Sequence, residues 1–170
     1  ILSAMDIADV SQIAEIGAEY GGMTSILADY AEVKDGHLFS IDPNPKQEFL
    51  EWVNAHKSVT HIARPSLSAL PNLKNIDLWM VDGDHNWFTV YHELKAIEAA
   101  CERDGKPLFA IMHDVCWPAG HRDMYYAPDG IAKEYRHDDC MDGGSRPGQS
   151  WSVRQMVMRG RGTLGLCFRE

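Results

Sequence analysis

The feature that most constrains the fold is a series of short apolar segments, each ending near a glycine, a serine or a charged residue. Strands that are almost continuously apolar, rather than alternating apolar and polar, are typical of a parallel sheet covered by helices on both faces. We therefore predict an α/β fold with a doubly wound, mostly parallel sheet. Its first five predicted strands are Gln12–Gly17, His37–Asp42, Thr60–Ala63, Ile76–Asp82 and Pro107–Met112.

Apolar residues recur at helical spacing between these strands, and two further strands are expected near the C-terminus. The predicted helices are Ser25–Tyr30, Lys46–His56 and a segment from Asn86 to about Cys101. Thr163–Phe168 is predicted as the last strand and Trp151–Met158 as the one before it. Residues 115–150 lack periodicity and are rich in Gly, Pro, Asp and His. A loop this long is typical of a functional lid or of a disordered surface loop.

Composition limits the cellular setting and the partners. The chain has 170 residues, enough for one domain with a sizeable core, and its net charge of −9 argues against nucleic acid as a partner. No apolar run reaches the length of a membrane span, and the cysteines form no CxxC pair. We expect one cytoplasmic domain over residues 1–170 that can form a homo-oligomer and has no membrane partner. The chain begins at Ile1 rather than Met, which is compatible with a fragment.

A glycine-rich turn follows the first predicted strand. Glycines in the turn Gly17–Gly21 would let a ligand approach the backbone, and Asp42 ends the next strand, 25 positions after Gly17. A carboxylate at that place can accept hydrogen bonds from the ribose hydroxyls of an adenosine. The turn is not GxGxxG, and its Glu19 would repel a pyrophosphate, which counts against a dinucleotide. We interpret the pair as an adenosine-type site; an ordinary turn is the alternative.

Acidic residues and histidines also follow the fourth and fifth predicted strands. Asp82, Asp84 and His85 follow the fourth strand, and His113 and Asp114 close the fifth. Ligands of open α/β sheets bind outside the carboxyl ends of the strands, so these residues are expected to face a ligand. Two alternatives stay open: Asp82 and Asp84 cap the following helix, and His113 is a histidine hydrogen-bonded to backbone.

The combination resembles the class I methyltransferases that use S-adenosylmethionine, in which an acid and Gly-x-x-x-Gly close the first strand and a second acid closes the next. The likeness covers about residues 10–118. It implies a Rossmann-like sheet with an antiparallel edge, and a position near adenine for Ser66, which as a residue after proline is also an ordinary turn residue. The donor-binding residues implied in this way are Glu15, Gly17, Gly21, Thr24, Asp42, Ser66, Asp82 and Asp84.

Residues 82–87 are similar to the DGDH strand end of the metal-dependent O-methyltransferases, a branch with catechol, caffeoyl-CoA and macrolide sugar enzymes. This likeness implies that Asp82 and Asp114 bind a divalent cation such as Mg²⁺ and that His85 is the general base. The chain departs from the branch at His113, where the sugar enzymes have a second carboxylate. His113 is therefore a candidate ligand, and three alternatives stay open for the metal: a weaker site, a softer site or no metal.

The segment after the fifth strand is predicted to bind the acceptor as a lid. Its candidate substrate-binding residues are Trp117, His121, Arg122 and Tyr125. Together these observations predict a methyltransferase that acts on a hydroxyl of a small molecule or sugar with metal assistance. The alternatives are a methyltransferase-like module that binds the nucleoside without turnover, and an NAD-dependent oxidoreductase.

Overall fold

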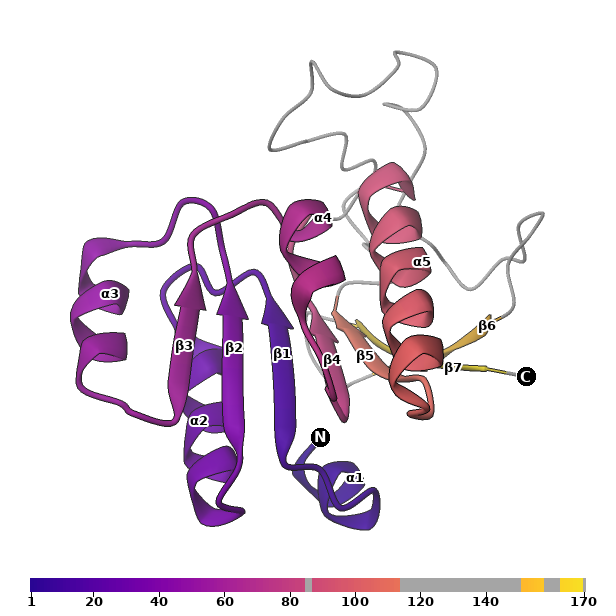
Figure 1. Cartoon of the computed structure of the whole chain (residues 1–170), viewed down its shortest axis with the longest axis horizontal. Coiled ribbons are helices and arrows are strands. Elements are labelled where there is room, and N and C mark those ends of the chain that lie inside the picture. The colour runs from indigo at the N-terminus through magenta and orange to yellow at the C-terminus, as the bar shows by residue number, and fades with distance from the viewer. Residues whose placement is uncertain (85–86, 114–150, 158–162, 170) are drawn as a thin grey trace.

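The computed structural model describes residues 1–84, 87–113, 151–157 and 163–169, the last two ranges by their backbone alone (Figure 1). A seven-stranded sheet has the order β3-β2-β1-β4-β5-β7-β6. Its strands are β1 (Gln12–Ile16), β2 (His37–Ile41), β3 (Val59–Ile62), β4 (Leu78–Val81), β5 (Phe109–His113), β6 (Trp151–Val157) and β7 (Thr163–Arg169). The predicted α/β fold is confirmed, and each predicted strand lies within a few residues of its place.

The first five strands are parallel, and the last two are not. β1 pairs with β2 and β4, β2 with β3 and β4 with β5, all in parallel. β7 is antiparallel to β5, and β6 is antiparallel to β7, which confirms the antiparallel edge. All four residues of β4 are buried, as expected for a central parallel strand with helices on both faces.

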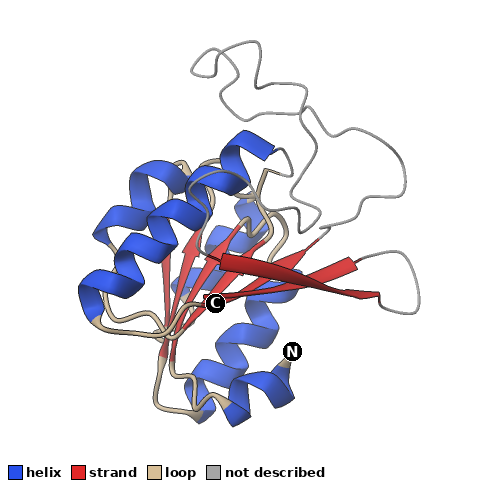
Figure 2. Ribbon diagram, turned by 90° about the vertical axis from the view of Figure 1, so that its right-hand side faces the viewer, coloured by secondary structure: helices blue, strands red, loops and turns tan. Residues whose placement is uncertain are grey.

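Helices cover both faces of the sheet (Figure 2). The helices are α1 (Leu2–Ile7), α2 (Gly22–Val33), α3 (Gln47–Asn54), α4 (Ser66–Ala69) with the short 3-10 helix η1 (Leu70–Asn72), and α5 (Trp87–Asp104). Residues of α1, α2 and α3 pack on one face and residues of α4, η1 and α5 on the other. No helix in the described part of the chain is long and apolar enough to cross a membrane.

Two short helices were not predicted from the sequence. α1 has six residues and no side-chain cap, and its Met5 is completely buried in the core beside Val10 and Ile13. α4 has four residues, and its Ala69 belongs to the same core cluster as Leu94 of α5. Isolated helices of this length are unstable in water, so both depend on packing against the rest of the chain.

Polar contacts stabilise the amino-terminal ends of β1 and β4. The carboxylate of Asp77 accepts hydrogen bonds from the backbone N–H of Ser11 (3.1 Å) and of Gln12 (2.9 Å), and it pairs with Lys106. This one side chain therefore connects the starts of β1 and β4 with the segment that leads into β5.

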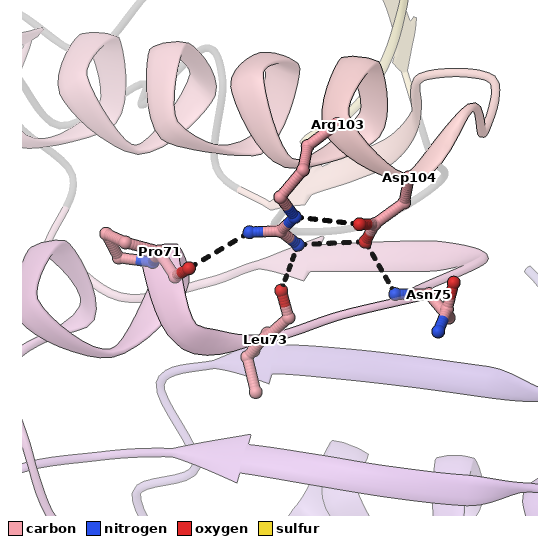
Figure 3. A network of polar contacts seen from close by, with 5 residues as sticks. All are labelled: Pro71, Leu73, Asn75, Arg103 and Asp104. Carbon is pink, nitrogen blue, oxygen red and sulfur yellow. Dashed lines mark hydrogen bonds and ion pairs between the residues drawn. The ribbon is translucent and has the colours of Figure 1, made fainter.

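Polar contacts also connect the C-terminal end of α5 to the segment that precedes β4 (Figure 3). The Arg103 guanidinium donates to the carbonyl oxygens of Pro71 and Leu73 and to the carboxylate of Asp104, whose pKa it lowers to about 2. Asp104 also accepts a hydrogen bond from the backbone N–H of Asn75 (2.6 Å). The loop before β4 is thus tied to α5 through backbone groups.

We expect Asp77→Ala to lower the free energy of unfolding by about 2–3 kcal/mol, because two backbone donors and Lys106 lose a charged partner. Urea unfolding followed by circular dichroism measures the change. Glu51→Ala, on the exposed side of α3, is the matched control and is expected to stay within about 0.5 kcal/mol. An Asp77→Ala protein as stable as this control would contradict the stabilising role of the Asp77 carboxylate.

Candidate active site

The carboxyl ends of the central strands lie side by side. Ile16 of β1 is in register with Ile41 of β2 and with Val81 of β4. The backbone N–H of Gly17 donates to the Ile41 carbonyl (2.9 Å), and that of Asp82 donates to the Ile16 carbonyl (2.9 Å). The residues that follow these strands therefore lie together at the carboxyl ends of the strands, as the sequence predicted. We call this end of the sheet its carboxyl edge.

Gly17 allows β4 to approach the turn after β1. Its φ is +88°, and a Cβ built there would lie 2.1 Å from the carbonyl oxygen of Asp82. Gly21 has φ +82°, and a Cβ on it would lie 2.7 Å from the Phe49 ring. Packing within the chain thus already requires both glycines, whatever ligand the turn binds.

Asp42 holds the glycine-rich turn in place. Its Oδ2 accepts hydrogen bonds from the backbone N–H of Ala18 (3.1 Å) and of Glu19 (2.9 Å), and its Oδ1 accepts one from Asn44 (2.8 Å). Glu19 has a left-handed φ of +46° that these bonds help to hold. Oδ1 accepts a single bond among the described residues, so it keeps capacity for a ligand hydroxyl.

Glu15 lies beneath the same turn, 1% exposed. Its Oε2 accepts hydrogen bonds from the hydroxyls of Thr24 (2.6 Å) and Ser40 (3.1 Å), and within the described residues its Oε1 has no partner. Burial raises the pKa of Glu15 to about 7. Glu15 and Thr24 therefore join β1, β2 and α2 below the turn, and their direct contact with a donor stays a prediction.

Asp82 and His113 form a pair at the ends of β4 and β5. The Nδ1 atom of His113 is 3.0 Å from Oδ1 of Asp82, and both side chains are partly exposed. The sequence placed both residues in one site, and the structure brings them together. Within the ranges that the structure describes, no group of three His, Cys, Asp or Glu side chains could hold a metal ion.

Asp84 contacts the start of α5. The Thr89 hydroxyl donates to Oδ2 of Asp84 at 3.3 Å, which links this acid to a side chain in the first turn of the helix, and the capping alternative stays a prediction. The contact of Asp84 with S-adenosylmethionine stays a prediction. Other predicted site residues lie outside the described ranges: His85, Asp114, Trp117, His121, Arg122 and Tyr125.

Glu93 was not among the predicted site residues. It is completely buried on the face of α5 that carries Val90, Leu94 and Ile97. The Ser66 hydroxyl donates to its Oε1 at 2.5 Å, and its Oε2 has no partner among the described residues. Burial raises the pKa of Glu93 to about 8. The sequence signal was an acid on the apolar stripe of a helix, where a charged residue is not expected.

The raised pKa of Glu93 predicts a dependence of stability on pH. The unfolded chain ionises Glu93 near 4.5 and the folded chain near 8, so the stability that the neutral acid provides is complete below pH 4.5. It decreases as the pH rises and is lost above about 8. We expect Glu93→Gln to reduce the fall in Tm between pH 5 and pH 8.5, measured by differential scanning fluorimetry.

Glu48→Gln, in the exposed first turn of α3, is the control for this pH series and should keep the wild-type fall in Tm. If the Glu93→Gln protein also kept that fall, Glu93 would ionise in the folded chain as it does in water, and its neutral state would be excluded.

Solved structures with the same fold include methyltransferases of several kinds. The O-methyltransferase NcsB1 from neocarzinostatin biosynthesis, in complex with S-adenosylmethionine and 2-hydroxy-5-methyl naphthoic acid, has a TM-score of 0.65 at 13% identity over 96% of this chain and 50% of that one. The S-adenosylhomocysteine-bound methyltransferase PaMTH1 from Podospora anserina has a TM-score of 0.63 at 14% identity, over 99% of this chain and 76% of that one. The N-methyltransferase NodS from Bradyrhizobium japonicum has a TM-score of 0.59 at 14% identity, over 99% of this chain and 92% of that one.

These likenesses establish the fold, and the family follows from the sequence. This chain spans about half the length of NcsB1, and no curated protein matches it. The model of a family described as a methyltransferase domain matches residues 14–115, which begin within β1 and extend past the end of β5. The chain therefore has the class I methyltransferase fold and belongs to the methyltransferase-domain family.

Proposed function

We propose that this chain transfers the methyl group of S-adenosylmethionine to a hydroxyl oxygen of a small molecule or sugar. The observation that carries the proposal is the Asp42 carboxylate, which holds the turn after β1 and has acceptor capacity left at Oδ1. Both hydroxyls of a ribose need such an acceptor. NcsB1 and PaMTH1, whose structures contain the donor or its product, have the same fold.

The charges at this edge suit a sulfonium donor. Asp42 follows β2, and Asp82 and Asp84 follow β4; both strands pair with β1, and each of the three side chains is partly exposed. Their carboxylates favour a positive ligand by electrostatic attraction, whereas they would repel the pyrophosphate of a dinucleotide. This supports S-adenosylmethionine over NAD and counts against the oxidoreductase alternative.

The transfer itself needs an oxygen nucleophile in line with the methyl carbon. A lone pair of the acceptor oxygen forms the new C–O bond, the C–S electrons move to sulfur, and S-adenosylhomocysteine leaves. The hydroxyl proton goes to His85, which we propose as the general base on the strength of its place after Asp84. Trp117, His121, Arg122 and Tyr125 are proposed to bind the acceptor.

A divalent cation is proposed beside Asp82, with His113 and Asp114 as the further ligands. Oδ1 of Asp82 and Nδ1 of His113, which lie 3.0 Å apart, are the two described atoms that would hold such a cation. A bound cation would lower the pKa of the acceptor hydroxyl, and the mixture of imidazole and carboxylate suits Mn²⁺ or Zn²⁺ as well as Mg²⁺.

Calorimetric titration tests the donor site. We expect micromolar binding of S-adenosylhomocysteine and none of NAD⁺, and binding at least about tenfold weaker in Asp42→Asn, because a charged acceptor is lost. Asp29→Asn, on the exposed face of α2, is the matched control and should bind as the wild type does. Binding of NAD⁺ alone would favour the oxidoreductase. Binding of S-adenosylhomocysteine without turnover in an acceptor screen of sugars and catechols would favour the non-catalytic module.

The metal proposal is tested by Mn²⁺ binding, followed by electron paramagnetic resonance. We expect Asp82→Ala to reduce Mn²⁺ affinity by about tenfold or more, since one of a few ligands is removed, while S-adenosylhomocysteine still binds. Asp29→Asn again serves as the control. Equal Mn²⁺ affinity in Asp82→Ala and the wild type, or full turnover after chelation, would exclude a metal at this place.

A further inference from the structure

Large apolar side chains gather on the outer side of α1 and α2. α1 buries Met5 alone, and its other five residues are exposed. Ile7 is 88% exposed, and Val33 at the end of α2 is 83% exposed. In the described part of the chain, five of the seven exposed large apolar side chains lie on these two helices or directly before α1. We call these five the α1–α2 surface: Ile1, Leu2, Ile7, Ile26 and Val33.

Asp6 joins the two helices at this surface. Its Oδ1 accepts a hydrogen bond from the Tyr30 hydroxyl (3.1 Å) and pairs with the Lys34 ammonium group (3.1 Å). Ile7 follows Asp6 and Val33 precedes Lys34, so two strongly exposed apolar side chains flank one contact between the helices. Figure 1 shows α1 at the end of the sheet where β1 begins, so this contact lies away from the carboxyl edge and the proposed active site.

Exposed acids accompany the apolar side chains. Lys34 is the only basic residue among residues 1–36, and it is already paired with Asp6. The exposed acids on α1, on α2 and just after each helix are Asp6, Asp9, Asp29, Glu32 and Asp35. An apolar patch with polar residues around it is typical of an interaction site, and charges of one sign favour a partner of the opposite sign.

We propose that the α1–α2 surface binds an amphipathic helix of a partner protein, with Lys and Arg bordering its apolar face. The surface lies on two helices rather than on a strand edge, so it suits a packed helix better than an added strand. A second copy in a two-fold dimer would bring the same acids against one another, and an anionic membrane would be repelled by them. The inference goes beyond methyl transfer and does not depend on it.

A synthetic peptide serves as the probe. It is a fluorescein-labelled amphipathic helix of about 18 residues made of Leu and Lys, and its binding is followed by fluorescence anisotropy. We expect a Kd of about 10 µM or tighter, and binding at least about tenfold weaker in the double variant Ile7→Ser with Val33→Ser. A peptide with Glu in place of Lys, and a Leu–Lys peptide scrambled so that it has no apolar face, should not bind.

Two further variants separate this surface from the general acidity of the chain. Asp29→Asn combined with Glu32→Gln is expected to weaken binding about fivefold and to reduce its dependence on salt. Glu48→Gln combined with Glu51→Gln removes the same charge from the exposed side of α3 and should bind as the wild type does. Leu67→Ser removes an exposed apolar side chain of α4 and should also leave binding unchanged.

Each outcome decides for or against the proposal. Ile7 and Val33 are exposed, so their serine variants should keep the wild-type Tm and the wild-type affinity for S-adenosylhomocysteine. Equal peptide binding in the serine double variant and the wild type, or no binding by the wild type, would overturn the proposal. A wild-type dimer in analytical ultracentrifugation that Val33→Ser dissociates would also overturn it, because a second copy would then cover the surface.

Discussion

The close approach of β4 to the turn after β1 is the constraint on which the rest of the site depends. Gly17 lies against the backbone of Asp82 with no space for a Cβ between them, and its N–H reaches across to the Ile41 carbonyl. Three strand ends are thereby fixed relative to one another through backbone contacts. Asp42 and Asp82, which we propose to face one ligand, each follow one of these strand ends.

Two buried acids support that edge from opposite faces of the sheet. Glu15 lies on the side of α2 and joins Thr24 and Ser40, whereas Glu93 lies on the side of α5 and joins Ser66. In each acid one oxygen is hydrogen-bonded and the other has no partner among the described residues. Burial raises both pKa values, to about 7 and about 8. Burial therefore disfavours the ionised form of both acids and limits the negative charge that they place in the core.

The pair of Asp82 and His113 connects the proposed metal to the proposed chemistry. A carboxylate and an imidazole 3.0 Å apart suit both an ion pair and two neighbouring ligands of one cation. The substitution of an imidazole for a carboxylate distinguishes this site from those of the sugar enzymes that the sequence resembles. Structural neighbours that include an O- and an N-methyltransferase show that the fold alone does not determine the acceptor atom.

The sequence by itself determined the class of fold, the order of strands and helices along the chain, and most residues at the strand ends. It could do so because apolar runs, glycines and acids at strand ends are local signals, and parallel pairing brings their carboxyl ends together. Only the tertiary structure decided the rest. α1 and α4 are too short to form alone, so packing creates them, and the role of Glu93 depends on Ser66, 27 positions away. The packing at Gly17 also comes from a distant strand, because a contact between residues far apart in the chain leaves no periodic signal in either segment.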